Sequence, residues 1–180
     1  MIMEEENKPF PPCIPYKTFE SFMSMLKQRL PTRIDLSYLS DKFSISIGTQ
    51  LMYAMSFLKL IDINARPTPR LKLLVLATGE HRAALMRQVA DESYTFLFKV
   101  SLDIQHTTYT ELVDVFLNTY GMKINVCRKC INFFLAFCED AGIPLSSDFV
   151  SKRQNLFTNS GKKHQEEAGF IGAGQKSGST

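Results

Sequence analysis

Apolar side chains recur at helical spacing along most of this chain, and residues that end helices separate the recurring stretches. In the first stretch, Phe19, Phe22 and Met23 lie three or four positions from the next apolar residue, so they share one face of a helix. Residues that stop or cap helices divide the stretches: Pro31, Pro67, Gly79, Gly121 and Gly142. The pattern predicts a mainly all-α fold in which amphipathic helices bury their apolar faces in a common core.

Local signals set the bounds of these helices. Asp35 and Thr68 are expected N-cap residues, because their side-chain oxygens can accept a bond from an unpaired N–H of the first turn. Thr108 and Glu111 form a capping-box pattern. The expected helices span residues 16–30, 34–43, 47–60, 69–76, 80–100, 109–120 and 125–142, with a Ser-rich turn at 44–48 and a short half-buried strand at 61–64.

Size and composition restrict the class of protein. The chain of 180 residues is long enough for one ordinary domain or two small helical units. Its hydrophobic share of 44% includes 14 Phe, enough bulky apolar surface to build a packed core. The acidic start and the lack of a long apolar run argue against a secretory signal and a membrane span. We therefore expect a cytoplasmic protein without a membrane partner.

Changes in composition divide the chain into four parts. Residues 1–15 are acidic and then proline-rich, which predicts a flexible lead-in. Residues 16–78 predict a winged-helix-like unit with at most a small β wing, and residues 79–145 predict a helical unit packed on it. Residues 146–180 are rich in Ser, Gly, Lys, Gln and Asn with isolated Phe, which predicts a disordered tail.

Two motifs resemble chemical sites, but their context favours a structural role. Cys127 and Cys130 have the two-residue spacing of a zinc knuckle, yet with Cys138 they continue one apolar stripe of a helix that holds no His. Buried free thiols are the favoured interpretation. The segment 169–177 resembles a phosphate-binding loop with one residue inserted, but no strand before it and no helix after it is indicated. We expect neither a metal nor a cofactor.

The remaining polar residues form no recognisable catalytic set. His81, His106 and His164 are far apart in sequence, and hydrolase, zinc-protease and dinucleotide motifs are absent. We therefore expect that the protein is not an enzyme and has no catalytic residues.

The order of elements between Tyr16 and Arg66 is that of a winged helix-turn-helix: helix, short helix, tight turn, helix and short strand. In this interpretation residues 47–60 form the recognition helix and residues 62–66 form a reduced wing. Outer side chains of the helix would reach base edges, and neighbouring cations would contact phosphates. The candidate nucleic-acid-binding residues are Thr49, Gln50, Tyr53, Lys59, Arg66, Arg70 and Lys72.

Two functions from different classes remain open. The first is a non-enzymatic recognition module that binds double-stranded DNA through the winged-helix-like unit. The formal net charge of +3 is modest, and the recognition helix carries a single Lys near its end, so the electrostatic case for DNA is weak. The alternative is a protein-interaction or self-association module, which docks a partner or a second copy on an apolar face left open by the last two helices.

Five segments resemble a family of bacterial, archaeal and phage proteins known only as a domain of unknown function. The segments are Pro15-Tyr16, Phe57-Leu-Lys-Leu-Ile-Asp62, Pro67-Thr68, Tyr94-Thr-Phe-Leu-Phe98 and Phe133-Phe-Leu-Ala-Phe-Cys138. All are helix ends or core positions rather than chemical groups. The resemblance covers residues 15–142 and implies a winged-helix-like start, a helical unit and no established activity. Members often continue into a further strand-helix element, so the resemblance also predicts that this chain is a truncated form.

Overall fold

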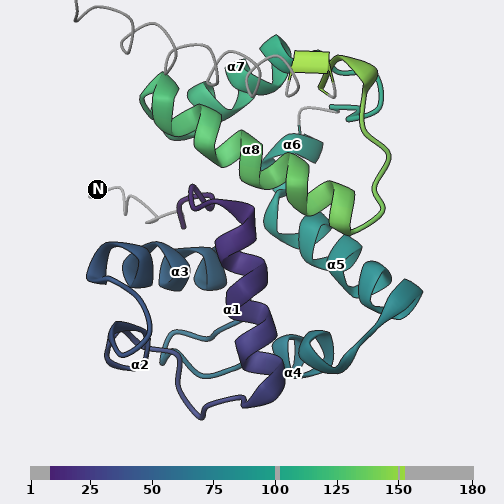
Figure 1. Ribbon diagram of the computed structural model, residues 1–180. Coiled ribbons are helices and arrows are strands. Elements are labelled where there is room, and N and C mark those ends of the chain that lie inside the picture. Colours follow the sequence, from purple (N-terminus) through teal and green to yellow (C-terminus); the bar gives the residue numbers. More distant parts are fainter. Residues whose placement is uncertain (1–8, 100–101, 150, 153–180) are drawn as a thin grey trace, which may run out of the picture.

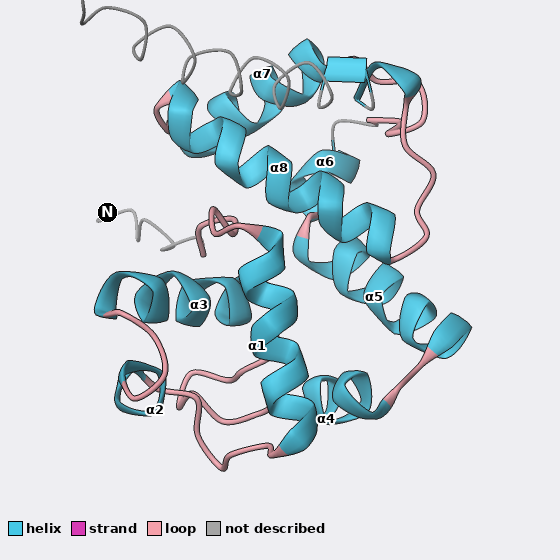
Figure 2. Cartoon of the chain, in the orientation of Figure 1, coloured by secondary structure: helices cyan, strands magenta, loops and turns pink. Residues whose placement is uncertain are grey.

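The computed structural model describes residues 9–99, 102–149 and 151–152. The mainly all-α fold is confirmed, and within these ranges eight named helices are arranged around α1 and α8 (Figure 1, Figure 2). The helices are α1 (Tyr16–Gln28), α2 (Leu36–Ser40), α3 (Ile45–Phe57), α4 (Pro69–Leu76), α5 (Gly79–Ser93), α6 (Thr95–Lys99), α7 (Tyr109–Tyr120) and α8 (Ile124–Asp140). Among the described residues, no helix combines the length and the apolar character that crossing a membrane requires.

The first helix, α1, joins the two halves of the chain. Its predicted apolar stripe is buried, and α1 packs against α4 and against α8. The rings of Tyr16 and Phe19 each lie with their centroids 5.4 Å from that of Phe133 in α8, in edge-to-face geometry. Phe19 and Phe22 are almost completely buried, and each such ring contributes roughly 1.5–3 kcal/mol through burial. The core is therefore continuous from α1 to α8.

The start of α3 differs from the prediction, because Ser44 caps the helix instead of beginning a turn. The Ser44 hydroxyl accepts a hydrogen bond from the backbone N–H of Ile47 at 3.4 Å, and α3 begins at Ile45. Gly48 therefore lies inside the helix, where a Cβ would come within 3.2 Å of the Leu39 Cβ. The missing side chain at Gly48 lets α2 pack closely on α3.

A hairpin follows α3, and a single antiparallel bridge between Ile61 and Pro67 closes it. The strand predicted here is reduced to this bridge, because the Asp62 carboxylate accepts two backbone N–H bonds of 2.8 Å from residues further along the turn and bends the chain back. A backbone hydrogen bond of 2.7 Å from Ile34 to Ala65 ties the hairpin to the segment before α2. The hairpin is thus part of the folded N-terminal half.

The single long helix predicted for residues 80–100 is divided at Tyr94. This residue leaves the helical conformation, with φ of −96° and ψ of 33°, and the chain restarts as α6. The fully buried Tyr94 ring packs on Phe57, with centroids 4.9 Å apart, and on Phe134, with centroids 4.6 Å apart. The break therefore brings an aromatic ring between α3 and α8, an arrangement that local periodicity does not encode.

The predicted ends of the later helices are confirmed. Thr108 and Glu111 make both bonds of the capping box at the start of α7, and Gly121 ends α7 in the left-handed conformation with φ of 59°. The following helix, α8, contacts α1, α5 and α7. The buried residues of α8 are Cys127, Cys130, Ile131, Phe133, Phe134, Leu135, Ala136, Phe137 and Cys138. α8 is therefore the central element of the C-terminal half.

Part of the proline-rich lead-in, which was predicted to be flexible, is buried over residues 11–14. Pro11 and Pro12 are buried, and Ile14 keeps 2% of its surface exposed. The thiol of Cys130 in α8 donates a hydrogen bond of 3.5 Å to the Pro11 carbonyl. Proline excludes a helix here, but its apolar ring and its carbonyl still pack against a helix. Residues 1–8 lie outside the described part.

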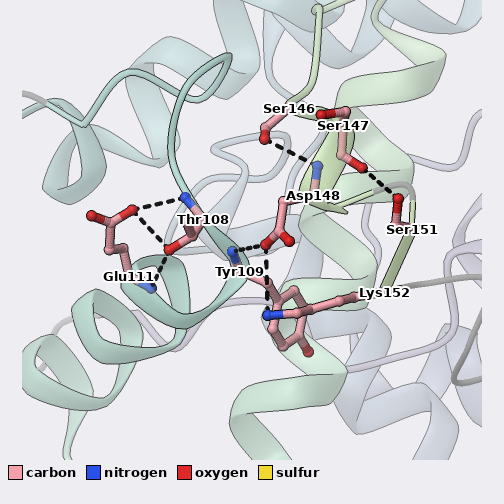
Figure 3. Close-up of polar contacts among 8 residues, drawn as sticks. All are labelled: Thr108, Tyr109, Glu111, Ser146, Ser147, Asp148, Ser151 and Lys152. Atoms are coloured by element: carbon pink, nitrogen blue, oxygen red, sulfur yellow. Dashed lines mark hydrogen bonds and ion pairs between the residues drawn. The ribbon is translucent and has the colours of Figure 1, made fainter.

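The predicted disordered tail begins too early at residue 146. Phe149 keeps 1% of its surface exposed, and the backbone N–H of Ser146 donates a hydrogen bond of 3.1 Å to the Ile104 carbonyl. The Asp148 carboxylate accepts a hydrogen bond of 2.7 Å from the backbone N–H of Tyr109 at the start of α7 (Figure 3). The buried ring of Phe149 and the contact of Asp148 with the start of α7 therefore hold residues 146–149 against the folded body. Residues 153–180, with His164 and the Gly-rich segment, lie outside the described part.

Candidate recognition surface

The helix α3 has a buried side and an exposed side. Leu51, Ala54 and Met55 are fully buried, whereas Ile45 keeps 77% and Tyr53 keeps 57% of its surface exposed. No residue of α3 carries a charge. We call the outer side the α3 face; it consists of the exposed Ile45, Ser46, Tyr53 and Ser56 and of the half-buried Thr49 and Met52, of which Met52 also packs against the core. The α3 face is therefore an uncharged, partly apolar surface that is open to solvent.

The polar candidates on α3 make hydrogen bonds within their own helix. The Thr49 hydroxyl donates to the Ile45 carbonyl at 2.8 Å, and the Gln50 amide donates to the Ser46 hydroxyl at 3.3 Å. Gln50 also lines a cavity of about 560 Å³ between α3, the lead-in and α8. Tyr53 is 57% exposed, whereas Gln50 is half-buried, so of these two candidates Tyr53 is the more open to a partner.

Two of the candidate phosphate contacts bind the end of α5 instead. The Lys59 ammonium donates a hydrogen bond of 3.0 Å to the Glu92 carbonyl, and the Arg70 guanidinium forms an ion pair of 2.7 Å with the Glu92 carboxylate. The hydrogen bond from Arg70 holds the pKa of Glu92 below its ordinary value. The structure thus brings Lys59 and Arg70 together around Glu92, where part of their charge is neutralised.

The other two candidate cations remain exposed at separate elements. Arg66 lies in the hairpin, and Lys72 lies on α4. Of the four candidate cations, two therefore contact Glu92 and two are exposed on different elements.

Sequence reasoning missed an apolar surface next to the α3 face. Leu36 on α2 keeps 42% and Ile47 on α3 keeps 36% of its surface exposed. Leu36 and Ile45 line a shallow cavity of about 280 Å³ between α2 and α3. The sequence did contain a signal for this surface, since residues 43–58 include no charged residue. An exposed helix usually carries charges on its outer face, so such a run is unusual.

The apolar face that we expected to be open on the last two helices is buried instead. In α8, Cys130, Phe134 and Cys138 keep 1% or less of their surface exposed, and in α7 Leu112 and Phe116 are fully buried. These faces pack against each other and against α5 and α1. A docking surface on the described residues must therefore be sought elsewhere.

A polar cluster joins α1, α5 and α8 beside a cavity of about 400 Å³. The Tyr16 hydroxyl and the Arg82 guanidinium both donate hydrogen bonds to the Asp140 carboxylate. Burial raises the pKa of Tyr16, and the bond to Asp140 raises it further. Burial also raises the pKa of Asp140, but the bonds from Arg82 and Tyr16 outweigh it and keep the pKa below its ordinary value. The cluster therefore ties the start of α1 and Arg82 of α5 to the end of α8.

The three cysteines of α8 are buried free thiols, as predicted. Burial raises the pKa of both Cys127 and Cys138. Cys13 in the lead-in is half-buried and also free. Within the described part of the chain, no group of three or more His, Cys, Asp or Glu is arranged to hold a metal ion.

Comparison with known proteins gives one match. No curated protein and no solved structure matches the chain significantly. A family model described as a family of unknown function, DUF5343, matches residues 14–148. The matched range contains every named helix from α1 to α8. The chain belongs to this family of unknown function.

Proposed function

We propose that the chain is a non-enzymatic recognition module that docks a second copy of itself through the α3 face. The observation that carries this proposal is the lack of charge on an exposed helix whose outer side presents Ile45 and Tyr53. In a two-fold dimer, each face meets its own copy, so a charged face would place like charges together. The uncharged α3 face avoids this repulsion.

The side chains of the α3 face are suited to such a contact. Apolar burial supplies the driving force, and Tyr is enriched among residues that dominate binding energy because it combines a large apolar ring with a hydroxyl. The neighbouring Leu36, which lines a cavity together with Ile45, extends the apolar area onto α2. Ser46, Thr49 and Ser56 supply a polar rim without charge.

Sedimentation of the purified chain over a range of concentrations tests this proposal. We expect a monomer-dimer equilibrium that shifts to monomer when Ile45→Asp and Tyr53→Asp are combined, because two buried negative charges would face their own copies. The matched control is Leu73→Asp on α4, where the side chain is 54% exposed but lies outside the α3 face. A chain that stays monomeric up to about 100 µM, an affinity range typical of weak complexes, would contradict the proposal.

DNA binding is the second candidate function. It is favoured by the order of α1, α2, α3 and the hairpin, which is that of a winged helix-turn-helix, and by the exposed cations Arg66 and Lys72. Because phosphate contacts release counterions, binding of mixed-sequence duplex DNA should weaken steeply with salt. Fluorescence anisotropy at two salt concentrations measures this dependence.

Variants of the basic residues test whether DNA binds at the proposed phosphate contacts rather than through the overall positive charge of the protein. The combined change Arg66→Ala, Arg70→Ala and Lys72→Ala should reduce both the affinity and the salt slope. Glu92→Gln should raise the affinity, because it frees the paired Arg70 guanidinium. If the triple variant bound duplex DNA as well as the unchanged protein, the proposed phosphate contacts would be wrong.

A further inference from the structure

A cavity of about 560 Å³ lies where the segment before α1 passes between α3 and α8 (Figure 1). We call it the lead-in cavity; residues 13–17, Gln50 of α3 and one face of α8 line it. Ligand pockets in proteins commonly have volumes of about 300–1,000 Å³, so the cavity has the size of a small-molecule site. Among the described residues, none of the α3 face lines it, so a ligand there is independent of the proposed dimer contact.

The lining of the lead-in cavity is mostly apolar. Ile14, Phe133 and Ala136 line it, and each keeps 8% or less of its surface exposed. Tyr16 also lines it, and because its hydroxyl donates to the Asp140 carboxylate, its ring is the part that remains for a ligand. The ring centroids of Tyr16 and Phe133 are 5.4 Å apart. An apolar ligand in the cavity would therefore bury its surface against apolar groups, which favours binding.

The cavity is bordered by two cations. Lys17 in the first turn of α1 and Lys129 on α8 line it, and no described Asp or Glu does. Neither lysine forms an ion pair with another residue of the described part of the chain. Both ammonium groups are therefore available to an anion that enters the cavity.

The thiol of Cys13 also lines the cavity and offsets part of this charge. The hydrogen bond with Cys130 and the charge of Lys129 lower the pKa of Cys13 to about 6, although burial opposes them. A thiolate is thus present at neutral pH, but the two ammonium groups outnumber it. The charge around the cavity is therefore positive.

The residues that α8 contributes change from polar to apolar along the helix. Lys129, Asn132, Phe133 and Ala136 line the cavity, and their spacing of three and four positions places them on one face. With a rise of 1.5 Å per residue, Lys129 and Ala136 are about 10 Å apart along the axis. The cavity thus follows a strip of α8 that has a cation at one end and apolar side chains at the other.

We propose that the lead-in cavity binds a small carboxylic acid with an apolar chain, whose carboxylate lies at the Lys129 end and whose chain lies along Phe133 and Ala136. The amides of Gln50 and Asn132 supply further hydrogen-bond donors for the carboxylate. The two ammonium groups attract an anionic head and repel a cationic one. The strip of about 10 Å along α8 suits an extended chain.

Calorimetric titration of the full chain with decanoate tests the proposal. We expect about one decanoate per chain and a Kd below about 1 mM. Decyltrimethylammonium has the same chain with a cationic head and should bind at least about tenfold more weakly, because its head would face the two lysines. A chain that binds no decanoate at about 1 mM, or that binds both compounds equally, would overturn the proposal.

Protection of Cys13 shows whether the ligand lies in this cavity. At a decanoate concentration about ten times its Kd, alkylation of Cys13 by iodoacetamide should slow about tenfold, because the bound ligand covers the thiol. Mass spectrometry of the labelled Cys13 peptide measures the rate. Binding that leaves this rate unchanged would place decanoate elsewhere on the protein and would overturn the proposal.

Substitutions of the two lysines test the role of their charge. Lys17→Gln and Lys129→Gln should each weaken decanoate binding about two- to fivefold, the range of exposed ion pairs, and together about tenfold. The matched control is Arg128→Gln, which removes the same charge from an exposed neighbour on α8 that does not line the cavity; its effect should stay below about twofold. An equal loss in the control would mean that only the overall charge attracts decanoate, contrary to the proposal.

A larger side chain at the apolar end tests the position of the ligand chain. Ala136→Leu places additional carbon atoms in the space proposed for the chain and should weaken decanoate binding at least about tenfold. Circular dichroism verifies that the variant is folded. A folded Ala136→Leu variant with unchanged affinity would contradict the proposed position, and the lysine variants, which change exposed side chains, test the site without altering the core.

Discussion

The Arg82 guanidinium in α5 holds the Asp140 carboxylate at the end of α8 through two hydrogen bonds of 2.7 Å. The Tyr16 hydroxyl at the start of α1 donates to the same carboxylate. The side chains of Arg82 and Asp140 are 30% and 26% exposed, so solvent screens this pair less than a pair at the surface. One carboxylate therefore joins three helices that are far apart in the sequence.

Loss of this carboxylate should destabilise the protein. Asp140→Ala leaves the half-buried Arg82 and Tyr16 without their shared acceptor, and we expect the free energy of unfolding to fall by about 1–3 kcal/mol. Urea unfolding followed by circular dichroism measures the change. The control is Arg33→Ala, because Arg33 and Asp35 are 3.6 Å apart and 60% and 35% exposed; its effect should stay below about 0.5 kcal/mol. Equal losses in the two variants would contradict a special role for Asp140.

The same contact predicts a dependence of stability on pH. The bonds from Arg82 and Tyr16 outweigh burial and hold the pKa of Asp140 in the folded protein below its ordinary value of 3.8. The charged form is thus favoured by folding, and its contribution is present above the ordinary pKa and lost as the pH falls through the lower, folded pKa. As the pH falls below about 4, the difference in urea midpoint between the unchanged protein and Asp140→Asn should therefore shrink. A difference that stays constant as the pH falls would count against the assignment.

The rate at which the Cys13 thiol is alkylated should depend on pH with a midpoint below that of an ordinary cysteine. With a pKa of about 6, the rate of its alkylation by iodoacetamide should rise with pH and level off above about pH 7, because the thiolate is the reacting form. Cys130→Ala removes the hydrogen bond that lowers this pKa most, so the midpoint should move toward about 8.5. Mass spectrometry of the labelled Cys13 peptide gives both curves. A midpoint that is the same in the two proteins would show that Cys130 does not set the pKa.

The packing of residues 146–149 predicts that Phe149 stabilises the folded body. Phe149→Ala removes an aromatic ring that is 1% exposed, and we expect a loss of about 3 kcal/mol in the free energy of unfolding. Ser147→Ala changes an exposed neighbour and should be close to neutral. Thermal and urea unfolding of the two variants provide the comparison. Similar stabilities would mean that this segment adds little to the core.

The helices that were predicted well are those whose signals are local. The capping box of Thr108 and Glu111, the left-handed Gly121 and the Thr68 cap before Pro69 all lie where expected. Each involves residues at most four positions apart, so sequence spacing alone determines whether the groups can meet. The apolar stripe of α1 was predictable for the same reason.

The candidate site was predicted only in part, because its character depends on distant partners. Tyr53 is exposed on α3 as expected. The proximity of Lys59 and Arg70 to Glu92 could not be read from a window of neighbouring residues, since Glu92 belongs to a later helix. Lys59 and Arg70, which were expected to contact phosphates, therefore contact Glu92 within the protein.

Short-range patterns were sufficient for the all-α class and most helix ends, because a helix is defined by bonds between residues three and four apart. Tertiary packing decided the break at Tyr94, the docking of the lead-in on α8 and the order of residues 146–149. In each case the stabilising partner lies in another segment, so the gain from burial appears only when the helices have assembled. The uncharged α3 face was visible in the sequence as a run without charge, but its exposure became evident only from the structure, in which Leu51, Ala54 and Met55 on the opposite side are buried and α2 packs against α3.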